Sequence, residues 1–198
     1  MFMIVRFPCK DKILKNSVIK AVEKIYRDKI NKPIHISFRD GMKVNTGNHA
    51  LEVIDRYKRF PTELTKYDER VIKNQHNGLF HIIQLSKVDF IETHYGLKEK
   101  KITYPWKDIF SIHRLSNHPQ LCWFSHILTH ELRHAWQSDL LLTEKDDNFR
   151  YQHNYINKRK KKGLSNQAHN NVWEYDAEVY SKDNSNKLFS MIKKGFKE

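Results

Sequence analysis

The most constraining feature of this sequence is the HELRH run at residues 130–134. On an α-helix, residues four apart lie about 40° apart around the axis, so His130 and His134 project from one face. Two imidazoles in this position can share one metal ion, at about 2.0–2.1 Å from zinc. Glu131 lies about 100° round from His130, near enough to accept a proton from a metal-bound water. The run therefore predicts a metal site on a helix.

The residues around this run predict a helix from Pro119 to Ser138. Proline suits a first helical position, and no proline or glycine follows before Ser138. The apolar residues on the side opposite the histidines are Leu121, Phe124, Leu128, Leu132, Ala135 and Trp136. The helix thus has one face for a core and another for chemistry, and the leucines at 140–142 are expected to follow its end and pack on the core.

Length and composition predict a single domain over residues 1–198. A chain of 198 residues with 39% hydrophobic and 12% aromatic residues can form one sizeable core. No apolar run approaches the roughly 20 residues needed to span a bilayer. The first residues lack the basic leader of a signal peptide, and Cys9 and Cys122 belong to no CxxC pair. We therefore expect a cytoplasmic protein with no membrane span and two packed cysteines.

The net charge of +13 is spread over much of the chain, with one dense basic cluster from Lys158 to Lys162. Such a cluster is typical of a solvated loop, or of a contact with a polyanion such as nucleic acid. Charge alone does not decide between these two interpretations.

The rest of the sequence predicts an N-terminal helix and several short strands. Apolar residues recur at spacings of three and four over 12–30, which is typical of an amphipathic helix. Residues 34–38 alternate as in a half-buried strand, and 79–85, which follow Asn77-Gly78, form the clearest strand pattern. Residues 56–75 are polar, as in a loop followed by a short helix. Weaker strand patterns cover 50–54, 88–91 and 109–115.

A hydrolytic zinc site needs a third protein ligand and an open position for water. The extended pattern HExxHxxGxxH is excluded, because Gln137 and Leu140 stand where it requires glycine and histidine. His153 and His169 are later histidines, but both lie in a polar segment with no helical frame. A ligand from this segment and a ligand from a later helix are both open.

That later helix is predicted over about 173–192, and it carries three acidic candidates: Glu174, Asp176 and Glu178. Its expected apolar side consists of Val172, Tyr175, Val179, Leu188 and Phe189.

Together these segments resemble zincin metallopeptidases of the gluzincin type, and are similar to small bacterial and phage-type zincins with a HELRHxxQ helix and a later ExDA helix. Matched residue by residue, the resemblance implies that His130, His134 and Glu174 bind Zn²⁺. It implies that Glu131 is the general base, and that Glu178 hydrogen-bonds a ligand histidine.

This sequence departs from the commonest gluzincin pattern at two positions. Glu178 stands where aspartate is usual, so Asp176 remains a rival for the outer role or for the ligand itself. Arg133 lies between the two ligand histidines, where the pattern is usually uncharged, and could reach solvent or an acidic partner. His126 lies one turn before His130 on the same face. This position suits a residue that supports a ligand histidine from behind or lines the wall of the cleft.

The resemblance also implies a fold and a function. The fold would be α+β and zincin-like, with a helix and small mixed sheet in 1–116, the active-site helix in 117–139, and a basic loop and ligand helix in 140–198. Substrate would pair with an edge strand, either 79–85 or 109–115. The function would be zinc-dependent hydrolysis of peptide bonds in a peptide or protein substrate. Candidates for oxyanion stabilisation are His113, Tyr151, Tyr155 and Tyr180.

A different class of function follows from the charge. The chain could be a basic protein associated with nucleic acid, with a structural or inactive metal site.

Overall fold

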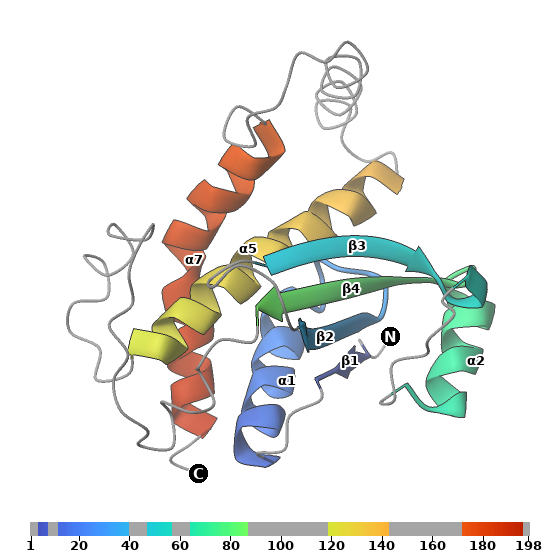
Figure 1. The fold of residues 1–198 in the computed structure, drawn as a ribbon, viewed down its shortest axis with the longest axis horizontal. Helices are drawn as coiled ribbons and strands as arrows, with labels where there is room; N and C mark the ends of the chain where they lie inside the picture. The colour runs from blue at the N-terminus through green and yellow to red at the C-terminus, as the bar shows by residue number, and fades with distance from the viewer. Residues whose placement is uncertain are drawn as a thin grey trace.

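The computed structural model describes residues 4–7, 12–39, 47–56, 64–86, 119–142 and 172–195. Within these ranges the chain is α+β, with four α-helices and one mixed four-stranded sheet (Figure 1). This confirms the predicted class. The predicted strands at 88–91 and 109–115 and the basic cluster from Lys158 to Lys162 lie outside the described residues.

The sheet has the strand order β1-β2-β4-β3. Its strands are β1 (Val5–Arg6), β2 (Ile34–Arg39), β3 (Gly47–Val53) and β4 (Leu79–Ser86). β1, β2 and β4 are parallel, whereas β3 is antiparallel to β4 and forms an edge. The prediction that 79–85 could be the edge strand is therefore wrong.

β4 lies between β2 and β3, and both of its faces are apolar. Ile83 and Leu85 belong to the larger core, while Phe80 and Ile82 pack with Ile72 on the other face. Apolar residues on both faces are typical of a strand covered on both sides. The strand pattern of 79–85 after Asn77-Gly78 predicts the strand correctly, but it does not identify which strands lie beside it.

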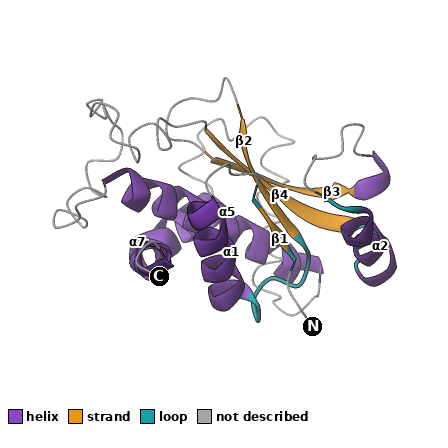
Figure 2. Cartoon of the chain, turned by 90° about the horizontal axis from the view of Figure 1, so that it is seen from below, coloured by secondary structure: helices purple, strands orange, loops and turns teal. Residues whose placement is uncertain are grey.

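Helices cover both faces of the sheet. α1 (Lys12–Tyr26), α5 (Pro119–Leu142) and α7 (Val172–Gly195) lie on one face, and α2 (Lys66–Gln75) lies on the other (Figure 2). A capping box at Thr65 and Asp68 starts α2. Asp68 also forms an ion pair with Arg6 of β1, so the start of this helix is fixed to the sheet.

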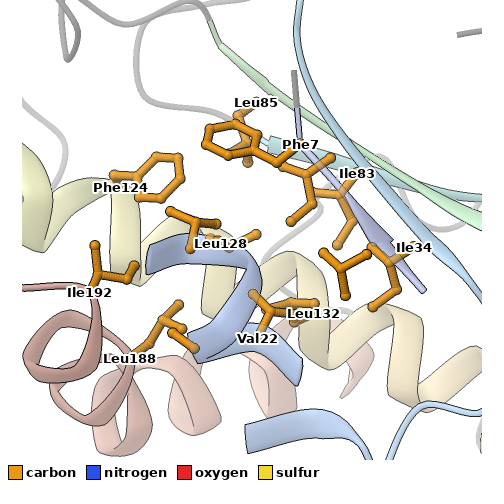
Figure 3. Packing of buried hydrophobic residues seen from close by; sticks show 14 of the residues in the cluster. Phe7, Val22, Ile34, Ile83, Leu85, Phe124, Leu128, Leu132, Leu188 and Ile192 are labelled. Atoms are coloured by element: carbon orange, nitrogen blue, oxygen red, sulfur yellow. The ribbon is translucent and has the colours of Figure 1, made fainter. Parts of the chain in front are cut away.

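The larger core lies between the sheet and the three helices. Figure 3 shows Leu128 and Leu132 of α5 between Val22 of α1, Leu188 of α7 and Ile83 of β4. The predicted core face of α5 is confirmed: every member is buried except Trp136, which is partly buried. Cys122 is buried, as expected. None of the described helices is long and apolar enough to cross a membrane.

Several element bounds differ from the predictions. α1 ends at Tyr26 and not at residue 30, because the amides of Lys29 and Ile30 both bond to the Tyr26 carbonyl in a closing turn. α5 runs on to Leu142, through the leucines expected to follow it. β3 begins at Gly47, three residues before the pattern that predicted a strand.

The predicted apolar side of α7 is partly wrong. Tyr175 and Val179 are 68% and 40% exposed, although Leu188 is buried as expected. The face turned to α5 carries Ala177 and Ser181, both fully buried, between the acidic residues of the helix. The periodicity of apolar residues does not identify a packed face that consists of small and acidic residues.

The core assignment predicts unequal costs for two alanine substitutions. Leu128→Ala should lower the free energy of unfolding by roughly 2–5 kcal/mol, because the side chain is fully buried. Ile13→Ala on α1, where the side chain is 55% exposed, should change it by less than about 0.5 kcal/mol. Urea unfolding measures both, and similar costs would contradict this core.

Candidate metal centre

α5 and α7 lie side by side and bring three potential metal ligands together. Nε2 of His130 is 3.1 Å from Nε2 of His134. Glu174, in the first turn of α7, places Oε2 3.3 Å from His130 Nε2 and Oε1 3.5 Å from His134 Nε2. Donors held at about 2.0–2.1 Å from one tetrahedral zinc ion are about 3.4 Å apart. The spacing of the three side chains therefore suits a single ion.

The three side chains are accessible as well as close together. Those of His130 and His134 are about one-seventh exposed, and that of Glu174 is 39% exposed. Hydrolytic metal sites need such access, because one coordination position must remain for water or substrate. The structure thus brings together the two predicted histidines and the carboxylate expected to complete them.

A chain of polar contacts behind His134 fixes that ring. Its Nδ1–H donates to Gln137 Oε1 at 2.7 Å, and Gln137 Nε2 donates to Asp176 Oδ2 at 2.7 Å and to the Trp173 carbonyl at 3.2 Å. Asp176 also accepts from Arg133 Nε at 2.6 Å. With Nδ1 holding the proton, His134 directs an Nε2 lone pair towards the other two candidate ligands.

These contacts settle where Asp176 and Arg133 lie. Asp176 is bound to Arg133 and Gln137, so it supports His134 through an amide instead of replacing Glu174. Arg133 has the acidic partner that its position allowed, and its guanidinium also stacks 4.2 Å over the Trp136 ring. The HELRHxxQ pattern includes Gln137, but sequence reasoning gave this glutamine no role.

Glu178 and His126 lie behind His130. Glu178 Oε2 is 3.7 Å from His130 Nδ1 and 3.7 Å from His126 Nε2, one turn along α7 from Glu174. His126 Nε2 is also 3.2 Å from Ser181 Oγ. Burial lowers the pKa of His126 and so favours its neutral ring. Glu178 lies where the resemblance places an acidic residue beside a ligand histidine, and His126 lies behind His130, as its position one turn earlier suggested.

The carboxylates of α7 favour the charged form of His130. Burial lowers the pKa of His130, but hydrogen bonds to Glu174 and Glu178 and the charge of Glu131 outweigh it and raise the pKa to about 9. Hydrogen bonds from His130 and His134 hold the pKa of Glu174 well below its usual range. A divalent cation and a proton therefore compete for His130, which makes cation binding weaker as the pH falls.

Glu131 lies under the first residue of the edge strand. Its side chain is almost fully buried, and this burial raises the pKa of the carboxyl group. A Cβ atom at Gly47 would overlap Oε1, Cγ and Cδ of Glu131. The strand thus passes close over the predicted general base, at a residue that has no side chain. Gly47 was missed by sequence reasoning, because a glycine next to a weak strand pattern carries no signal of contact.

The predicted oxyanion candidates are placed differently or not described. His113, Tyr151 and Tyr155 lie outside the described residues, as do His153 and His169. Tyr180 is described, and its hydroxyl accepts from Lys29 Nζ at 3.2 Å while its ring packs edge-on against Trp136. These contacts direct its hydroxyl towards α1, so Tyr180 has no part in the function proposed below.

Comparisons with known proteins identify no relative of this chain. No family model matches it, and no curated protein and no solved structure is significantly similar to it. The chemistry is therefore inferred from the residues themselves. Two imidazoles and one carboxylate are donors that suit a divalent metal ion, and the buried carboxylate of Glu131 lies on the residue next to His130.

The close approach of Gly47 to Glu131 predicts coupled mutations. Gly47→Ala should lower the free energy of unfolding by about 1–3 kcal/mol, because the new methyl group overlaps the Glu131 side chain. When Glu131 is already replaced by alanine, Gly47→Ala should lower the free energy of unfolding much less. Chemical unfolding of the four proteins gives the coupling energy. Strictly additive costs would show that the two residues are not in contact.

Proposed function

We propose that this chain is a zinc-dependent metallopeptidase of the zincin type. His130, His134 and Glu174 hold the zinc ion, and Glu131 is the general base. The observation that carries this proposal is the convergence of three donor atoms from α5 and α7, with separations that suit one tetrahedral ion. The ordered contacts behind both histidines support it, because metal sites need rings of fixed tautomer and orientation.

The arrangement of the sheet also supports a zincin-like fold. β3 is the antiparallel edge of a small mixed sheet, its first residue touches Glu131, and α1 lies between β1 and β2 in the sequence. In the described part of the chain, β3 pairs with β4 alone. A peptide substrate would add to the other edge of β3 as a further strand, and main-chain hydrogen bonds would hold it beside the centre.

The residues of the chain then divide the work of hydrolysis. A bound zinc ion lowers the pKa of its water ligand towards about 7 and polarises a carbonyl group. Glu131 accepts the proton of the attacking water and delivers it to the leaving amine. Gln137, Asp176 and Arg133 keep His134 oriented, and Glu178 does the same for His130. Gly47 allows the edge strand to lie close to the general base.

The ligand set predicts that zinc binding depends on Glu174. Glu174→Gln removes the charge at nearly constant shape and should weaken zinc binding more than tenfold, because loss of even an outer partner of a ligand costs 10–100-fold. Asp183→Asn, at an exposed carboxylate of the same helix, is the matched control. Competition titration with a zinc chelator measures both affinities. Equal affinities in the two variants would remove Glu174 from the centre.

The general base predicts a separation of binding from catalysis. Glu131→Gln should retain zinc but lose hydrolysis of an unstructured protein or peptide mixture by about 10²–10⁴-fold, the usual contribution of a general base. Mass spectrometry of the products and metal analysis of the same samples test both halves. Undiminished hydrolysis with full zinc content would exclude Glu131 from the reaction.

A further inference from the structure

A second histidine cluster lies inside the protein beside the candidate metal centre. His49 Nε2 on β3 is 2.9 Å from His81 Nδ1 on β4, and His81 Nε2 is 3.1 Å from Asp139 Oδ1 on α5. Asp139 is held in turn by Lys32 Nζ at 2.5 Å and by the amide of Asn31 at 2.6 Å. His81 and Asp139 are essentially inaccessible to solvent. The contacts form one line from β3 to the segment before β2.

This line begins next to the centre. Gly47 and His49 are two residues apart on β3, so they face the same side of the sheet, and Gly47 touches Glu131. At the other end, His81 contacts Asp139, two turns further along α5. His49 therefore lies along α5 between these contacts, and the charge of His134 reaches it.

The hydrogen bonds determine which nitrogens carry protons. Burial raises the pKa of Asp139, but hydrogen bonds from His81, Lys32 and the Asn31 amide outweigh it and lower the pKa to about 2. An ionised Asp139 only accepts, so His81 must donate from Nε2. When His81 is neutral, its Nδ1 is an acceptor, and His49 must donate from Nε2. The Nδ1 atom of His49 then has a lone pair.

We propose that His49, His81 and Asp139 form a proton relay that serves the metal centre. His49 takes up a proton at Nδ1 from the solvent of the site and gives its Nε2 proton to His81 Nδ1. His49 ends neutral with its proton on Nδ1, and His81 becomes an imidazolium beside the Asp139 carboxylate. The reverse transfer returns one proton to the site. His49 thereby changes from a hydrogen-bond acceptor to a donor without holding charge.

The surroundings disfavour a lasting charge on His49. Burial and the charges of His81 and His134 lower the pKa of His49 to about 3, so the ring resists a lasting charge of its own. Asp139 balances a charge on His81, although Lys32 shares that carboxylate. His76, at the end of α2, also senses the charges of Lys32 and Asp139.

The relay deepens the proposed function. The relay itself does not rest on that function, whereas the use of its proton at the metal centre does. A neutral N–H donor on β3 is the kind of group that could stabilise an oxyanion at the centre. Of the sequence-based candidates for that role, Tyr180 is directed towards α1, and the others lie outside the described residues. His49 would supply the donor once the relay is loaded, and Asp139 and His81 would act as positioning residues.

Nitrogen NMR of the imidazole rings tests the relay in the full-length protein, with and without zinc. At pH 8, His49 and His81 should both carry their proton on Nε2. As the pH falls, His81 should become charged while His49 switches to the Nδ1–H form at the same midpoint. Protonation of both nitrogens of His49, or no tautomer change in His49 while His81 titrates, would overturn the proposal.

Two variants separate this relay from the peptidase proposal. Asp139→Asn should lower the joint midpoint by about 1–3 pH units, because it removes the anion beside His81. If that variant fails to fold, His81→Asn serves instead, and His49 should then lose its tautomer switch. Neither readout needs activity, so an inactive protein with a working switch would contradict only the peptidase proposal. In an active protein, an unchanged pH profile of kcat in His81→Asn would exclude a role of the relay in catalysis.

Discussion

The contact between α5 and α7 is the constraint on which the rest of this structure depends. Ala177 and Ser181 are fully buried on the face of α7 that meets α5, and their small side chains allow the two helices to approach closely. Leu188 and Ile192 anchor the later part of α7 in the main core. Because this packing fixes the position of the first turn of α7, Glu174 reaches the two histidines and Asp176 reaches Arg133.

α5 carries several buried polar groups that contact other elements. Gln137 bonds to α7, Asp139 bonds to β4 and to the segment before β2, and Glu131 lies under β3. Burying such groups without partners would cost several kcal/mol each. The same contacts that make this burial tolerable also hold the sheet, α5 and α7 in one fixed relation around the centre.

Local patterns in the sequence predicted the helices and the histidine pair, because both depend on residue spacing along one segment. Glu174 was predicted by resemblance to a ligand helix, and the structure brings it to the histidines. The exposed positions of Tyr175 and Val179 could not be predicted by periodicity, because the packed face of α7 is small and acidic. The approach of Gly47 to Glu131, the contacts of Gln137 with α7 and the line from His49 to Asp139 depend on how separate elements pack, and no spacing within one segment encodes them.

The strand order has a consequence for how the chain assembles. β2 and β3 follow one another in the sequence, yet β4 lies between them in the sheet. During synthesis, β3 therefore emerges before the strand that it pairs with, and must wait until residues 79–86 arrive. Non-local pairing of this kind slows folding and leaves strand edges exposed in the meantime. A ribosome-bound intermediate that ends before β4 would present two unpaired edges of β3, which chaperones recognise.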